Sequence, residues 1–145
     1  MEKIQLDIQI NAPAKTVWDA LWKDENFRKW TSAFCAGSYA KSDWEEGSPI
    51  QFLDPKGDGM FSIIETKIPY QQMTFKHLGE MKQYEEKPKD WAGLKEAYFL
   101  TGDDTTTNLH VEMDATPELK KYMEETFPKA LLLVKEISEQ SLSNA

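Results

Sequence analysis

The sequence contains a single cysteine, Cys35, among 145 residues. One thiol cannot form an intramolecular disulfide, and it cannot supply a thiolate-rich metal site. Histidine is nearly as scarce, since His77 and His110 are the only two and no pair shows the spacing of metal ligands on a helix. We therefore expect no metal and no cofactor, and a reducing compartment such as the cytoplasm.

Long apolar runs and basic clusters are also missing. No stretch approaches the roughly 20 apolar residues of a membrane-spanning helix. The first ten residues alternate charged and apolar types, which is not the pattern of a secretory signal. The net charge is −8 and lysine and arginine form no cluster, so the surface repels nucleic-acid phosphates. We predict a cytoplasmic protein with no membrane span and no nucleic-acid partner.

The composition present is that of a globular chain. The hydrophobic fraction is 40% and the charged fraction is 29%, which is typical of a folded domain. A length of 145 residues is enough for one core. We expect one domain over residues 1–145.

The spacing of apolar residues in the first part of the chain predicts a strand and two short helices. Ile4, Leu6, Ile8 and Ile10 alternate with polar residues, which indicates a strand with one buried face. Apolar residues then recur at helical spacing over residues 13–22. A second helix of about two turns follows from residue 24, because Phe27 and Trp30 lie three apart.

Turn signals divide the middle of the chain into short segments rich in β-branched and aromatic residues. The expected strands cover residues 37–44, 48–54, 59–67, 72–78, 96–100 and 106–113. Short connections favour an antiparallel meander. Residues 80–93 are charged and carry Pro88, so we expect a mobile surface loop there. From residue 117 onward, apolar residues at three- and four-residue spacing predict a long helix that bends at Pro128.

Two segments resemble a known family. INAPAKTVWDALWKDENFRKW, residues 10–30, is similar to its strand end, proline and helix with a Val-Trp pair and a closing tryptophan. IETKIPYQQMTFKHLG, residues 64–79, is similar to its strand, proline turn and next strand. The family is that of homologues of the heat-shock protein 90 ATPase activator, within the START-like (SRPBCC) superfamily. This resemblance implies an α+β helix-grip fold: a curved antiparallel sheet of six to seven strands around a long C-terminal helix, with two short helices after the first strand.

The resemblance also implies a fold that encloses a cavity for a ligand. The family includes a co-chaperone domain that stimulates the chaperone's ATPase, and relatives in the superfamily bind lipids, hormones or polyketides. A few relatives catalyse cyclisation or dehydration. A shared fold does not decide among these functions, which depend on the residues of the site.

Several bulky side chains are candidates for the wall of a cavity between the sheet and the last helix. The apolar candidates are Trp30 at the mouth, Phe52, Met73, Phe75, Phe99, Met123 and Phe127. His77 and Tyr98 are the candidates for orienting a polar group of the ligand. The alternative is that these side chains fill the space and leave a solid core.

Two residues suggest acid–base chemistry. His77 shares a strand face with Met73 and Phe75, and it acts there either as a general base or as a hydrogen-bonded core histidine. Glu65 shares parity with Phe61 and Ile63, so a regular strand would point its carboxylate inward. A buried carboxylate needs a partner or a raised pKa.

Three hypotheses follow. The leading one is non-enzymatic binding of a small apolar or amphipathic ligand, with an opening near Trp30 and residues 80–93. The second is a protein-interaction module that regulates a chaperone ATPase, although the family's co-chaperone uses an additional N-terminal domain. The third is an acid–base enzyme that uses His77 with Glu65 or Tyr98 on an apolar substrate. The sequence predicts no oligomeric state.

Overall fold

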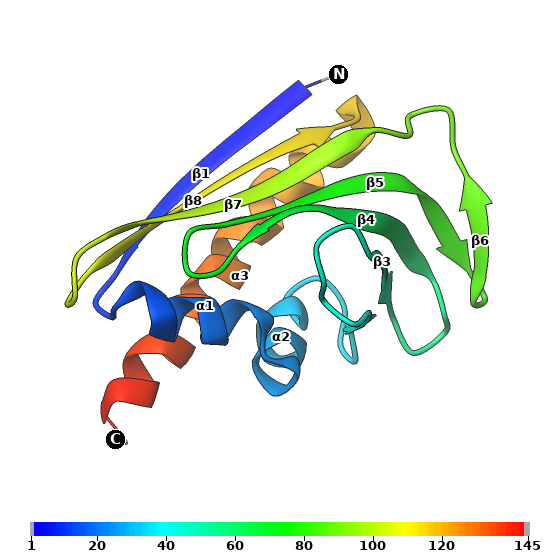
Figure 1. The fold of residues 1–145 in the computed structure, drawn as a ribbon. Helices are drawn as coiled ribbons and strands as arrows, with labels where there is room; N and C mark the ends of the chain where they lie inside the picture. The colour runs from blue at the N-terminus through cyan, green and yellow to red at the C-terminus, as the bar shows by residue number, and fades with distance from the viewer. Residues whose placement is uncertain (1, 144–145) are drawn as a thin grey trace.

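The computed structural model describes residues 2–143, which form eight strands and three helices. Their order and bounds are β1 (Glu2–Ile10), α1 (Ala14–Trp22), α2 (Asp24–Thr31), β2 (Tyr39–Lys41), β3 (Pro49–Leu53), β4 (Gly59–Ile68), β5 (Gln72–Lys82), β6 (Glu85–Pro88), β7 (Leu94–Gly102), β8 (Thr107–Ala115) and α3 (Pro117–Ser143). All three helices lie on the same side of one curved sheet (Figure 1). The predicted helix-grip α+β architecture is confirmed.

The sheet places its first strand, β1, beside its last strand, β8. Its strand order is β1-β8-β7-β5-β4-β3-β2, with β6 paired to β5, and every described pairing is antiparallel. β1 pairs with β8 over its whole length, with Ile4 opposite Met113. The long helix α3 follows β8 directly and packs against β1. The first strand and the last helix therefore close one side of the core.

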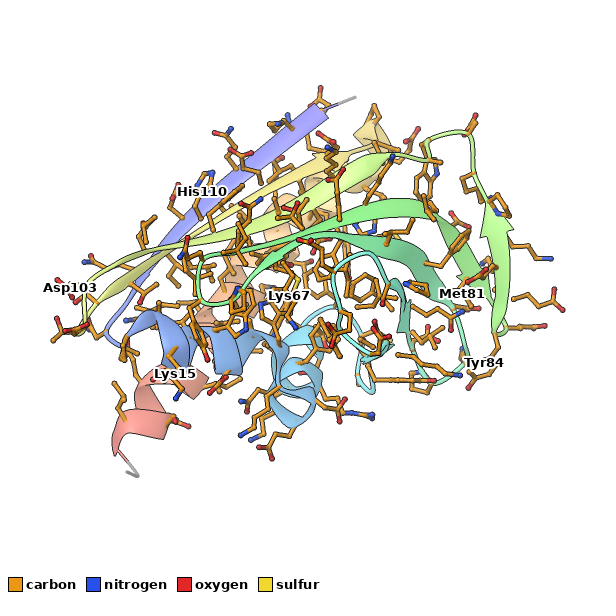
Figure 2. The ribbon with its side chains drawn as sticks, viewed as in Figure 1. Lys15, Lys67, Met81, Tyr84, Asp103 and His110 are labelled. Carbon is orange, nitrogen blue, oxygen red and sulfur yellow. The ribbon has the colours of Figure 1, made fainter. Side chains whose placement is uncertain are left out.

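Alternation along the strands gives the sheet a buried and an exposed face. In β8, Leu109, Val111 and Met113 are buried, whereas His110 and Glu112 lie between them on the opposite face. Figure 2 shows His110 on the side of the sheet away from the helices. We call the face that carries Leu109 and Val111 the inner face and the other the outer face.

The helices cover the inner face with aromatic and aliphatic side chains. Val17 and Leu21 of α1 are fully buried, and Trp30 of α2 is 2% exposed. The indole Nε1 of Trp30 donates a hydrogen bond to the Leu21 carbonyl at 2.9 Å, which ties α2 to α1. α3 continues through Pro128 without interruption, and its buried row includes Phe127 and Val134.

The prediction of a mobile loop at residues 80–93 is wrong for most of that segment. β5 extends to Lys82 and pairs with β6, which lies in this segment. Tyr84, at the hairpin tip (Figure 2), makes hydrogen bonds that a charge count cannot reveal. Its backbone N–H donates to the Gly57 carbonyl at 2.9 Å, and its hydroxyl donates to the Pro55 carbonyl at 3.1 Å. The hairpin is therefore fastened to the β3–β4 turn.

Replacement of Gly59 with alanine is expected to lower the free energy of unfolding by about 3 kcal/mol, through backbone strain and overpacking. Gly59 has a φ of +151°, and an added Cβ would lie 1.9 Å from the Phe52 carbonyl oxygen. Gly47→Ala is the matched control, because its φ is +87° but no atom lies within 4 Å of the added Cβ. Urea unfolding of both variants measures the difference. Equal losses would show that the contact with Phe52 relaxes freely.

In the part of the chain that the structure describes, no helix combines the length and the apolar character needed to cross a bilayer.

Candidate functional site

A pocket of about 320 Å³ opens between the inner face of the sheet, α2 and the first half of α3. The β3–β4 turn and the segment after α2 form its rim. Pockets that hold small molecules typically have volumes of about 300–1,000 Å³. Its size therefore suits a small ligand.

The walls of the pocket are mainly aromatic. The lining side chains and backbone come from Trp22, Phe27, Trp30, Thr31, Phe34, Cys35, Ser38, Tyr39, Phe52, Leu53, Asp54, Asp58, Gly59, Met60, Phe75, Glu96, Tyr98, Tyr122, Met123 and Phe127. Half of these residues carry an aromatic ring, so a ligand with an apolar or aromatic body would be in contact with rings on several sides.

Trp22 is the centre of the ring packing. Its indole makes edge contacts with Tyr98 and Phe75, at centroid distances of 4.9 and 5.5 Å. Trp22 is 8% exposed, and its Nε1 is buried without a hydrogen-bond partner among the described residues. A buried N–H donor without a partner is uncommon in folded proteins.

A network of polar side chains includes two residues of the pocket wall, Glu96 and Tyr98. Ser62 Oγ lies 2.6 Å from Nδ1 of His77, and Nε2 of His77 lies 3.1 Å from Oε1 of Glu96. The hydroxyl of Tyr98 donates to the other oxygen of Glu96. These four side chains come from β4, β5 and β7, which are adjacent in the sheet. We call them the polar cluster.

The polar cluster holds Glu96 ionised. Burial by itself raises the pKa of Glu96, but the hydrogen bond and attraction of His77 and the hydrogen bond from Tyr98 outweigh it, so that the pKa is lowered overall. Burial and the nearby Glu96 carboxylate raise the pKa of Tyr98 well above its ordinary value. The phenol therefore keeps its proton and remains the donor.

Six of the ten residues predicted from the sequence line the pocket. They are Trp30, Phe52, Phe75, Tyr98, Met123 and Phe127. Trp30 was expected at the mouth but is nearly inaccessible, so it belongs to the inner wall. The exposed positions of the described lining are Cys35, Gly59 and Tyr122. Residues 80–93, expected beside the opening, contribute no side chain to the described lining.

Met73 and His77 are on the inner face but outside the pocket wall. Met73 is completely buried in the core. His77 is 4% exposed and lies behind Glu96, so it would act on a ligand only through that carboxylate.

The inward orientation predicted for Glu65 and Phe99 is wrong. The buried positions of β4 are Ser62 and Ile64, so the opposite parity belongs to the outer face. Glu65 is also the extra residue of a β-bulge, and its carboxylate pairs with Lys95 at 3.2 Å. Phe99 follows the inward Tyr98 directly, and adjacent strand residues face opposite sides.

Both residues border a wider hollow of about 490 Å³ on the outer face, whose other lining residues are largely polar or charged. It has few of the apolar walls that enclose small ligands. We therefore place the candidate site on the inner face.

Sequence reasoning missed Glu96, the one carboxylate that reaches the pocket from the sheet. Its strand parity with Tyr98 and Leu100 was a usable signal, because both of those are buried. Trp22 and Phe27 belong to the hydrophobic core and also line the pocket. Within residues 2–143, no group of three or more His, Cys, Asp or Glu is placed to hold a metal ion.

A family model described as "Activator of Hsp90 ATPase homolog 1-like protein" matches residues 11–137. This span includes the three helices apart from the end of α3, and all strands except β1. Among curated proteins, none matches the sequence significantly.

Solved structures share the fold. A protein from Mesorhizobium loti superposes with a TM-score of 0.71 at 14% identity, over 96% of this chain and 98% of that one. A protein from Nitrosomonas europaea gives 0.69 at 16% identity, over 97% and 96%. The Aha1 dimer from Colwellia psychrerythraea gives 0.68 at 20% identity, over 96% and 95%. At these identities the likeness concerns the fold alone.

Proposed function

We propose that this chain, which belongs to the Activator of Hsp90 ATPase homolog 1-like protein family, binds a small apolar or amphipathic molecule in the inner-face pocket. The pocket itself is the observation that carries the proposal. Its volume of about 320 Å³ is that of a small-molecule site, and its rings supply apolar contact area. The Glu96 carboxylate supplies the polar contact that orients a ligand.

The test is native mass spectrometry of the protein as purified, followed by a thermal-shift screen of small aromatic and isoprenoid compounds. A ligand that binds only the folded state stabilises it by about 2.7 kcal/mol at one hundred times its Kd. We expect at least one compound to raise the Tm in proportion to the logarithm of its concentration. A protein that is empty and that no compound stabilises would contradict the proposal.

Replacing Met123 with tryptophan is expected to weaken binding of any such compound at least tenfold, because the larger side chain occupies pocket volume. Met123 projects from α3 into the lining. Leu132→Trp is the control, since Leu132 lies on the same helix and is 55% exposed. Calorimetric titration of both variants separates filling of the pocket from a general effect of tryptophan on α3. Equal affinities in the two variants would place the ligand elsewhere.

A second candidate function is interaction with a chaperone, which the family description favours. α3 exposes Leu119, Tyr122, Leu132 and Leu142, each by 41–55%. Exposed apolar side chains of this size are common at interaction surfaces. The test is binding to an Hsp90-type chaperone at low salt, where the charge of this acidic protein has its largest effect. No binding at low salt would remove this candidate.

Acid–base catalysis is a third candidate, now in a changed form. Glu65 cannot take part, because it lies on the outer face with Lys95. The groups that could move a proton at the pocket are Glu96 and Tyr98, with His77 behind them.

A cytoplasmic location also stays a proposal, supported by the single unpaired thiol of Cys35.

A further inference from the structure

The charged side chains of the pocket all have the same sign. Asp54, Asp58 and Glu96 line it, and the described lining includes no lysine, arginine or histidine. Asp54 accepts hydrogen bonds from the backbone amides of Lys56 and Asp58, and Asp58 accepts one from the backbone amide of Gln83 at the tip of the β5–β6 hairpin. These bonds keep both carboxylates in place without neutralising them. A ligand that enters the pocket therefore meets a negative potential at its rim and at its inner wall.

Glu96 retains capacity for a ligand. A carboxylate has about four acceptor positions, and His77 and Tyr98 occupy two of them. His77 lies outside the described lining, so the carboxylate of Glu96 is the charged group of the polar cluster that lines the pocket.

Glu96 has aromatic neighbours in the sheet. Glu96 alternates with Tyr98 on β7 and lies directly opposite Phe75 of β5. Trp22 packs on both of these rings. Aromatic faces attract a cation that lies within about 6 Å of their centroids, and the attraction grows when the site is desolvated. One carboxylate among aromatic rings is a suitable environment for a protonated amine.

We infer that the pocket selects a ligand with a protonated amine on an apolar or aromatic body, and that Glu96 is the residue that binds the ammonium group. This inference rests on the proposed binding function and specifies its ligand class. An ammonium group donates to the free acceptor positions of Glu96. A carboxylic acid of the same skeleton would place a second negative charge beside Glu96, which costs free energy in a site with little water.

The test uses three probes that share one carbon skeleton: 4-phenylbutylamine, 4-phenylbutan-1-ol and 4-phenylbutanoate. Calorimetric titrations at pH 7 and low salt compare their affinities for the intact protein. We expect the amine to bind at least tenfold more tightly than the carboxylate, with the alcohol between them. If all three bind equally, the binding function stands and the charge selectivity is overturned. If none binds while other compounds of the thermal-shift screen do, the pocket is a binding site and the inference of an amine ligand is wrong.

The alcohol tests a competing ligand. A hydroxyl group can both donate to Glu96 and accept a hydrogen bond, whereas an ammonium group can only donate. If the alcohol binds most tightly, recognition depends on a group that both donates and accepts, and the inference is overturned.

Glu96→Gln then identifies the residue responsible. Glutamine preserves the shape of the side chain and can still accept from Tyr98, so the variant should fold. We expect the amine to bind Glu96→Gln no more tightly than the alcohol does. Glu136→Gln removes the same charge from an exposed position in the second half of α3 and should leave the amine preference unchanged. A full amine preference in Glu96→Gln would overturn the assignment of Glu96.

Discussion

Replacement of Trp30 with alanine is expected to lower the free energy of unfolding by about 4 kcal/mol, which is the middle of the range for buried aromatic residues. The indole is 2% exposed and contacts the rings of Phe27, Trp22 and Tyr98. Its loss enlarges the space next to the pocket and removes the hydrogen bond to the Leu21 carbonyl. Chemical denaturation followed by circular dichroism measures the loss.

Two further variants separate the contributions. Trp30→Phe keeps most of the ring and loses the hydrogen bond, so we expect a loss of about 1–2 kcal/mol. Trp91→Ala makes the same chemical deletion at a half-buried loop position and should cost about 1 kcal/mol or less. If Trp30→Ala costs no more than Trp91→Ala, the inner wall of the pocket is loosely packed.

Replacement of His77 with leucine is expected to cost about 3 kcal/mol at pH 7, because it leaves a largely buried carboxylate without its main partner. The side chain of Glu96 is 20% exposed, and Tyr98 would be its one remaining described partner. In the variant, burial then dominates and raises the pKa of Glu96. The protein must either bury an unpaired charge or take up a proton.

The loss of stability caused by His77→Leu should depend on pH, and the pKa of Glu96 sets the direction of this dependence. In the native protein the pKa of Glu96 lies below its ordinary value of 4.5. Its stabilising contribution is therefore present above pH 4.5 and is lost as the pH falls through the lowered value of the folded state. In His77→Leu we expect the pKa of Glu96 to be raised, which destabilises the folded state only at pH values above the ordinary pKa of 4.5. The difference between the two proteins should thus shrink as the pH falls below about 4.5.

A double variant checks the assignment. His77→Leu leaves the charge of Glu96 without its main partner. The double variant of His77→Leu with Glu96→Gln removes that charge, so it should recover part of the lost stability. His110→Leu is the control on the outer face, where the histidine lies between Asp7 and Glu112 in contact with water. We expect it to change stability by less than about 1 kcal/mol. An equal, pH-independent loss in His77→Leu and His110→Leu would contradict the role given to the polar cluster.

The family and the pocket point to different uses of one molecule. The family description names an ATPase activator, whereas the pocket and its carboxylate favour a small ligand. The two candidates predict separable results. Met123→Trp should block ligand binding, while substitutions of the exposed residues of α3, such as Leu132, should affect a chaperone partner and not the ligand.

By itself, the sequence determined which residues face a common side. Alternation in β1 and β8 and the three- and four-residue spacing in α3 separate apolar from polar positions. These are local properties, since a strand has a period of two and a helix a period of 3.6 wherever it occurs. Together with the resemblance of residues 10–30 and 64–79, they were enough to predict the fold class and six residues of the pocket wall.

Only the tertiary structure decided which of two faces is inner in β4 and which partners meet across strands. Alternation along β4 predicts that Glu65 faces the same side as Phe61 and Ile63. It does not show that the buried residues of this strand are Ser62 and Ile64. Bulges shift the register between β4 and β5, and no local pattern marks them. The contact of His77 with Glu96 depends on the pairing of β5 with β7, and these two residues lie 19 positions apart in the chain. Such a contact is set by packing of the whole sheet, which is why the partner of the Glu96 carboxylate could not be read from the sequence.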